Sequence, residues 1–271
     1  MSVNCSDGWK KKVGKTEVND RMRKNKKPFF EQIEELTGHP ISRVQIGLHD
    51  FQEFKAIYKD DREGIDDQKL LEYFISYKFL DFNSSDTYID IAAQNCPFAF
   101  FVRERFGCQV YRQDLYYIER GIHGADIGGD ASRLPLKRKS VSKISLHNSF
   151  EHFEGNSDIL FIREAQRVLD IGGKMIIVPI LFEEEYRVET DSGWIDECGE
   201  KHLWNPGARF SRFYNIDQFK RRVIKNSTAF NIHFFFIENI KEIDQNCYGQ
   251  YFVIFEKIKS NPAKKWLPLI R

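Results

Sequence analysis

The chain has 271 residues, of which 41% are hydrophobic and 30% charged, proportions that are ordinary for a globular protein with a sizeable core. Its formal net charge is +1, so the overall balance gives no indication of a nucleic-acid partner. No apolar stretch approaches the roughly 18 residues of a membrane span, and the polar N-terminus does not resemble a signal peptide.

Residues 1–27 are expected to form a basic and flexible arm. Residues 1–30 contain nine Lys or Arg against three acids, a net charge of +6. Such an arm can contact phosphates or anionic lipid, or it can be a solvated terminus. We favour the solvated terminus, because no aromatic side chain lies between the lysines.

The five cysteines are scattered and form no C-x-x-C pair; they are Cys5, Cys96, Cys108, Cys198 and Cys247. An odd number without pairing spacing argues against a disulfide scaffold and against a zinc site. We therefore expect a reducing compartment and a cytoplasmic protein.

Residues 28–85 are predicted to be a helical lead-in. Phe29, Phe30, Ile33 and Leu36 recur at helical spacing before a stop at 38–40. A second helix is predicted over 66–82.

From residue 86 to 258, short β-rich segments alternate with helical ones. Strands are expected at 88–92, 109–113, 124–128, 141–147 and 174–179, with helices at 97–106 and 157–169, the second ended by Gly172 and Gly173. After an irregular insertion at 181–214, a helix at 216–224 precedes two strands, 230–238 and 251–257, which are expected to pair antiparallel at the sheet edge. Residues 259–271 form a tail. This order predicts an α/β fold with a mostly parallel, Rossmann-like sheet and flanking helices.

Acidic residues lie in or after the first three predicted strands. Asp90 lies in the first, at the start of the segment 90–97 that contains the following loop, and Asp114 directly follows the second. The run Gly129-Asp130-Ala131-Ser132-Arg133-Leu134-Pro135 follows the third. His147 ends the fourth, Glu151-His152 come shortly after it, and the next helix ends Arg167-Val168-Leu169 before the two glycines.

In this order and spacing, segment 86–180 resembles a class I S-adenosylmethionine (SAM) dependent methyltransferase of the group related to the ubiquinone and menaquinone enzymes. The resemblance implies a seven-stranded sheet and SAM as cofactor. It implies that Asp114 accepts hydrogen bonds from the ribose, that Asp130 and Ala131 contact the adenine, and that Asp90 orients the loop or the methionine end. The cofactor-binding set expected from it is Asp90, Ala92, Gln94, Asp114, Asp130, Ala131 and His147.

The loop departs from the family pattern, which carries three glycines here. Ala92, Gln94 and Cys96 stand at those positions. Glycine permits positive φ and close backbone approach. Two interpretations stay open: Gln94 forms a hydrogen bond with the cofactor, which we favour because the three aspartates remain, or the site no longer binds SAM.

Candidates for contact with the methyl acceptor are less specific. His147 is the candidate catalytic base at the end of the fourth strand. His152 is a second candidate, interpreted rather as a packing or capping residue. His147, Glu151 and His152 match no zinc spacing, so no metal is predicted. The insertion is the predicted substrate-binding region, with Trp194, His202, Trp204, Arg209 and Tyr214 suited to sugars, rings or anions. The alternative interpretation is a packed cap that covers the sheet edge.

Two functions are therefore weighed. The first is a SAM-dependent methyltransferase acting on a small molecule or a glycan-type acceptor, with no nucleic-acid partner. The second is a protein of the same fold that has lost catalysis and serves as a binding or assembly partner. A nicotinamide dehydrogenase is disfavoured, since no G-x-G-x-x-G follows the first strand. No feature indicates the oligomeric state.

Overall fold

The computed structural model describes residues 29–58, 65–190, 202–205 and 210–258. The first elements are α2 (Phe29–Thr37), β1 (Ile41–Val44), α3 (Leu48–Ile57), α4 (Asp67–Phe79), β2 (Thr87–Ile91), α5 (Phe98–Phe106), β3 (Gln109–Asp114), β4 (Gly121–His123), β5 (Asp126–Gly128), η1 (Ala131–Arg133) and β6 (Val141–His147). They are followed by η2 (Phe150–His152), α6 (Ser157–Val168), β7 (Leu169–Val178), β8 (Arg187–Thr190), β9 (His202–Trp204), β10 (Phe210–Phe213), α7 (Ile216–Arg222), η3 (Ile224–Asn226), β11 (Phe230–Ile237), α8 (Ile240–Ile243) and β12 (Tyr251–Lys257).

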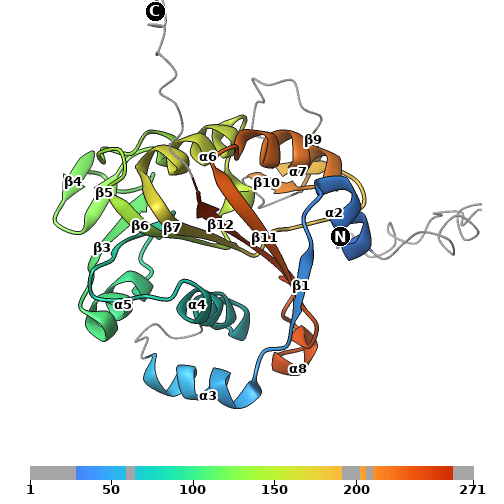
Figure 1. The fold of residues 1–271 in the computed structure, drawn as a ribbon, viewed down its shortest axis with the longest axis horizontal. Helices are drawn as coiled ribbons and strands as arrows, with labels where there is room; N and C mark the ends of the chain where they lie inside the picture. Colours follow the sequence, from blue (N-terminus) through green and yellow to red (C-terminus); the bar gives the residue numbers. More distant parts are fainter. Residues whose placement is uncertain (1–28, 59–64, 191–201, 206–209, 259–271) are drawn as a thin grey trace, which may run out of the picture.

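A single large sheet organises the molecule. Its nine strands lie in the order β1-β11-β12-β7-β6-β2-β3-β5-β4. All neighbouring pairs are parallel except those made by β12 and β4. Helices α2, α6 and α7 cover one face and α3, α4 and α5 the other (Figure 1). The predicted α/β class with a mostly parallel sheet is confirmed, with nine strands in place of seven.

Two details of the predicted sheet are wrong. β7 begins at Leu169, directly after the last residue of α6, so Gly172 and Gly173 lie inside a strand and do not end the helix. The β11–β12 hairpin is antiparallel as expected, yet it is not at the edge, because β1 from the lead-in pairs in parallel with β11. A four-residue strand with half-exposed side chains gives little hydrophobic pattern to detect.

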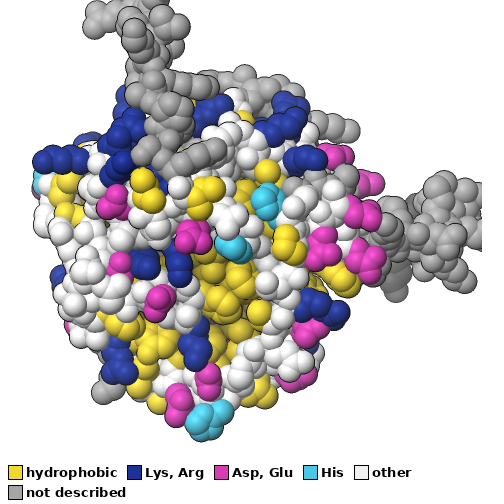
Figure 2. All heavy atoms as spheres, in the orientation of Figure 1, with side chains coloured by type: hydrophobic (Ala, Val, Ile, Leu, Met, Phe, Trp, Pro, Cys, Tyr) yellow, Lys and Arg dark blue, Asp and Glu magenta, His cyan; other side chains and the backbone are white. Residues whose placement is uncertain are grey.

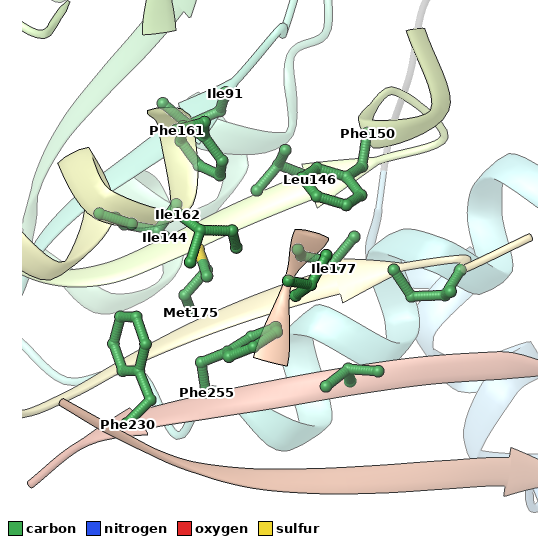
Figure 3. Close-up of a cluster of buried hydrophobic side chains, with 14 of the residues drawn as sticks. Ile91, Ile144, Leu146, Phe150, Phe161, Ile162, Met175, Ile177, Phe230 and Phe255 are labelled. Atoms are coloured by element: carbon green, nitrogen blue, oxygen red, sulfur yellow. The ribbon is translucent and has the colours of Figure 1, made fainter. Parts of the chain in front are cut away.

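Alternate residues of the central strands enter two separate cores. Met175 and Ile177 of β7 pack in the core beneath α6, where Phe161 and Ile162 join them (Figure 3). Ile176, from the same strand, packs in the core on the α4 side. Successive side chains of a strand point to opposite faces, so a strand covered on both faces is apolar throughout. The view in Figure 2 shows hydrophobic side chains gathered in its lower half, where Figure 1 places α4.

A small second sheet follows β7. Its three strands lie in the order β10-β8-β9 and fall within the predicted insertion. A buried ion-pair network attaches β10 to the main domain: Arg212 of β10 and Arg222 of α7 both bind Asp158 of α6, with N–O distances of 3.2 and 2.8 Å. The insertion is therefore held by charge as well as by packing.

The structure also bears on the cysteines and on membrane-spanning helices. Among the described residues, Cys96, Cys108 and Cys247 are buried and form no disulfide. Within the same ranges, no helix has the length and apolar character that crossing a bilayer requires.

Candidate functional site

The carboxyl ends of four parallel strands meet at one edge of the sheet. β6, β2, β3 and β5 are neighbours in that order. Their ends place Asp90, Asp114, Gly129 and His147 along that edge, with Asp114 directly opposite Gly128 in register. In open α/β sheets ligands bind outside the carboxyl ends of the strands, so this edge is the candidate site.

The loop after β2 has a glycine-like backbone without glycine. Ala92 has φ 55° and Gln94 has φ 44°, both in the left-handed region. These are two of the three positions at which the family pattern has glycine. The loop therefore has left-handed backbone geometry without glycine, at a steric cost of roughly 1–2 kcal/mol for each of these two residues.

Residues of the neighbouring strand hold this loop in place. The Gln113 side chain accepts a hydrogen bond from the Ala92 amide at 3.3 Å, and its backbone oxygen accepts one from the Ala93 amide at 2.9 Å. The Asp114 carboxylate accepts from the Gln94 amide at 2.7 Å, and the Tyr117 hydroxyl donates to the Gln94 carbonyl. The loop is thus fixed by β3 and its following turn.

Because Ala92 sits at positive φ, Ala92→Gly should stabilise the protein. We expect a gain of about 0.5–1 kcal/mol in the free energy of unfolding, since relief of the left-handed strain exceeds the entropy that glycine adds to the unfolded chain. Ala93, the next residue, is not among those with positive φ. Ala93→Gly should therefore destabilise by about 1 kcal/mol. Urea denaturation measures both, and a loss for Ala92→Gly equal to that for Ala93→Gly would contradict the strain.

The Asp114 carboxylate accepts a hydrogen bond from the loop and can still accept others. It is 3% exposed, and its second oxygen accepts from the Tyr116 amide at 2.8 Å. A carboxylate has about four lone-pair positions, so two remain. Burial raises the pKa of Asp114, and the nearby charge of Asp90 raises it further.

Asp90 and His147 form a buried pair at the centre of the edge. His147 Nδ1 lies 3.1 Å from Asp90 Oδ1, and its Nε2 lies 2.8 Å from the Ser76 hydroxyl of α4. Because a carboxylate only accepts, Nδ1 donates to Asp90, and in the neutral ring Nε2 then accepts from Ser76. Ser145 Oγ also donates to Asp90 Oδ1, at 3.0 Å.

This geometry gives His147 a positioning role. Both ring nitrogens are occupied within the protein, and the residue is 6% exposed, so it has no free nitrogen for a substrate. Asp90 is different: its Oδ2 is buried and has no hydrogen-bond partner among the residues that the structure describes. His147 and Ser145 thus hold one oxygen while the other is left for a donor from outside the protein.

A polar stripe on α4 completes the edge, and the predicted site residues do not include it. Gln68, Glu72 and Ser76 recur every four residues and are all buried. Gln68 Nε2 donates to Glu72 Oε1 at 2.9 Å, and Gln68 Oε1 accepts from the Tyr248 amide at 2.9 Å. Residues four apart share one helix face, so polar residues at this spacing in an apolar segment were the available signal.

Lys69 joins this stripe to the end of β6. Its ammonium lies 2.9 Å from Glu72 Oε2 and donates to the His147 carbonyl at 2.7 Å. Burial raises the pKa of Glu72, against the opposing effect of Lys69.

The remaining predicted residues occupy different positions. Asp130 is exposed and caps η1, accepting from the Ser132 amide at 2.8 Å, and Ala131 is buried beside it. Tyr214 is 1% exposed and donates to Asp158 at 2.7 Å. His202 and Trp204 belong to β9, whereas Trp194 and Arg209 lie outside the described residues. His152 is half-exposed, and its Nδ1 lies 2.6 Å from the Phe210 carbonyl.

No family model matches the sequence, and no curated protein matches it significantly.

Solved structures of similar fold include methyltransferases. One chain of a complex with the Haloferax volcanii Trm112 methyltransferase activator is 12% identical, with a TM-score of 0.49, covering 74% of this chain and 94% of its own. The Burkholderia thailandensis 1,6-didemethyltoxoflavin-N1-methyltransferase, with bound S-adenosylhomocysteine, is 11% identical, with a TM-score of 0.46, covering 81% and 94%. Haemonchus contortus phosphoethanolamine N-methyltransferase 1 is 16% identical, with a TM-score of 0.47, covering 80% and 50%. At such distances the function proposed below rests on this chain's own residues.

Proposed function

We propose that this protein is a SAM-dependent methyltransferase acting on a small-molecule or glycan-type acceptor. The observation that carries the proposal is the buried, unpartnered Asp90 Oδ2 next to a loop that keeps left-handed geometry without glycine. A buried acceptor without a partner is costly, so it implies a ligand that supplies a donor. The α-ammonium group of SAM is such a donor. Membership of the ubiquinone and menaquinone-related group stays a prediction.

The residues present fit the cofactor. Asp90 would hold the ammonium group, the two remaining lone-pair positions of Asp114 would accept from the ribose hydroxyls, and Asp130 with the Ala131 amide would contact the adenine. In the loop, Ala92 would line the cofactor through its backbone, and the exposed side chain of Gln94 would form a hydrogen bond with it. When bound, SAM supplies an activated methyl group on a sulfonium for in-line transfer to a nucleophile.

The part of this chain in catalysis would be positioning and exclusion of water. Ser145, His147 and Ser76 fix the Asp90 carboxylate from behind through buried hydrogen bonds. Such preorganised groups hold reactants without reorganising during the reaction. Trp194, His202, Trp204 and Arg209 are the proposed acceptor-side residues of the insertion. Tyr214 acts there indirectly, by anchoring β10 through Asp158.

One observation favours the alternative, a protein of this fold without catalysis that binds or assembles with others. Both oxygens of Asp114 already accept loop amides, so the ribose site is partly filled by the protein itself. The two functions differ in whether SAM binds.

Calorimetric titration of SAM and S-adenosylhomocysteine tests the proposal. We expect saturable binding of both to the wild type and at least tenfold weaker binding to Asp114→Ala, because hydrogen bonds to a charged acceptor are worth about 1.5–3 kcal/mol each. Asp170→Asn is the control, since Asp170 is exposed at the opposite edge, at the start of β7. No binding to the wild type at millimolar ligand would overturn the methyltransferase and favour the alternative.

A further inference from the structure

Unsatisfied oxygens gather at the ends of two neighbouring strands. Among the described residues, three buried side-chain oxygens have no hydrogen-bond partner: Asp90 Oδ2, Ser149 Oγ and Glu151 Oε2. Asp90 is the penultimate residue of β2, and the other two follow β6, the strand beside it. Carboxylate oxygens accept only, so whatever occupies this edge must present hydrogens. Asp90 is the oxygen assigned above to the cofactor, which leaves Glu151 for another group.

Within the described part of the chain, Glu151 has no lysine or arginine in contact. It is 5% exposed, and the nearest ion-pair atom is His152 Nε2, 3.8 Å from its other oxygen. The Nδ1 of that ring faces the Phe210 carbonyl at 2.6 Å and must donate to it, so Nε2 of the neutral ring carries no hydrogen. His152 therefore donates nothing to Glu151 unless the ring is charged.

Lys69, the lysine near Glu151, already has two partners of its own. Lys69 forms a 2.9 Å ion pair with Glu72 and also donates to the His147 carbonyl. Its charge lowers the pKa of both Glu72 and Glu151, so it lies near both carboxylates but contacts only one. When both carboxyl groups are ionised, they share one ammonium and a negative charge is left over.

Tyr248 lies near the same two carboxylates. Its hydroxyl donates to Asn148 Oδ1 at 2.8 Å, and its pKa is raised by burial and further by the charges of Glu72 and Glu151. Segments 68–72, 147–151 and 248–249, which carry Lys69, Glu72 and Glu151, are therefore linked by hydrogen bonds at the edge where the cofactor would bind.

Resting on the methyltransferase function proposed above, we propose that Glu151 binds the amino group of the methyl acceptor, so that the substrate class is a small primary or secondary amine. A cationic amino group donates a hydrogen bond to the unpartnered Glu151 oxygen and, in the same contact, neutralises the surplus negative charge. A neutral alcohol satisfies the oxygen but leaves the buried charge, which is the larger cost.

The same contact provides the proton transfer that the reaction needs. Glu151 accepts a proton from the bound ammonium, leaving a neutral amine whose lone pair forms the new N–C bond while the S–C bond of the methyl donor breaks. The products are an N-methylammonium and a neutral thioether, and the proton on Glu151 returns to solvent. Burial raises the pKa of Glu151, which favours its protonation at that step.

The first test needs no ligand. A carboxyl whose folded-state pKa is raised contributes stability at low pH that is lost as the pH rises through that value, so Glu151 should destabilise the unliganded protein most at neutral and higher pH. Glu151→Gln and Glu151→Met should each raise Tm by about 2–5 °C at pH 8, with a smaller gain at pH 5. The charged and titratable groups facing Glu151 are Lys69, His152 and Tyr248, and both variants keep them.

Glu104→Gln, on the exposed face of α5, is the matched control and should leave Tm unchanged at both pH values. If both Glu151 variants lower Tm equally at the two pH values, Glu151 is a structural residue and the amine site is overturned.

The second test uses an amine and its neutral analogue. Ethylammonium chloride, ethanol and sodium chloride are titrated at constant ionic strength into the complex with S-adenosylhomocysteine, with Tm and calorimetry as readouts. A three-atom ligand binds no tighter than about 1 mM, so concentrations up to about 100 mM are needed. We expect binding of ethylammonium alone, weakened at least tenfold in Glu151→Gln and unchanged in Glu104→Gln.

The outcomes separate the two proposals. Failure of S-adenosylhomocysteine to bind overturns the methyltransferase function. Its binding, with equal effects of ethylammonium on the wild type and Glu151→Gln, overturns the amine site alone. Preference for ethanol over ethylammonium would also overturn it and indicate a hydroxyl acceptor.

Discussion

Replacing Asp158 by alanine should lower the free energy of unfolding by about 3–5 kcal/mol, the cost of breaking a buried ion pair by removing one partner. Asp158 is fully buried and receives Arg212, Arg222 and the Tyr214 hydroxyl on its two oxygens. Arg212 itself has no exposed surface. Removal of the Asp158 carboxylate would leave the guanidinium groups of Arg212 and Arg222 buried without it.

Urea denaturation followed by circular dichroism measures this loss. Asp158→Asn keeps the shape and some hydrogen bonds but not the charge, so it should lie between alanine and the wild type. Asp217→Ala, at an exposed position in the first turn of α7, is the control and should cost no more than about 1 kcal/mol. A loss below 1 kcal/mol for Asp158→Ala would mean that the network contributes little.

Asp90→Asn should weaken SAM binding by about 10- to 100-fold and also destabilise the protein by about 1–3 kcal/mol. Ser145 and His147 both donate to Oδ1. An asparagine that keeps its oxygen toward these donors turns its NH₂ toward the cofactor, where it repels an ammonium group. The opposite rotamer sets the NH₂ against two donors, so neither orientation restores the native contacts.

Asp86→Asn is a matched control for this prediction. Asp86 is also buried, just before the same strand but at its amino end, and accepts from Ser142 Oγ at 2.7 Å. Asp86→Asn should lower the free energy of unfolding about as much as Asp90→Asn does, while its affinity for SAM stays within twofold of that of the wild type. Equal loss of affinity in both variants would show that Asp90 acts only through the fold.

The alternation of β-rich and helical segments was enough to predict the sheet, since β6 and β12 are buried along most of their length and lie at 141–147 and 251–257 as expected. Local patterns failed where pairing partners decided the structure. β1 exists because β11 offers it an edge. β7 begins at Leu169 because that residue pairs with Val141 of β6, and Gly172 and Gly173 lie in the irregular stretch before pairing with β6 resumes at Lys174.

The candidate site was predictable only where it follows strand ends. Asp90, Asp114 and Asp130 were identified because they stand, near the ends of predicted strands, where the family that segment 86–180 resembles has its cofactor-binding residues. Ser76, Lys69 and Tyr248 were not, because they reach that edge from α4 and from a loop about 100 residues after β6. The role of His147 likewise depended on Ser76, which no pattern around His147 reveals.

The polar stripe of α4 has a consequence for protein engineering. Helix α4 lies in the lead-in, outside the segment that resembles a methyltransferase, yet Ser76 and Lys69 both hydrogen-bond His147 at the end of β6. A chimera that joins a foreign N-terminal region to residue 86 would therefore exchange part of the site together with the lead-in. The smallest portable unit with an intact edge begins before Asp66, the residue that caps α4.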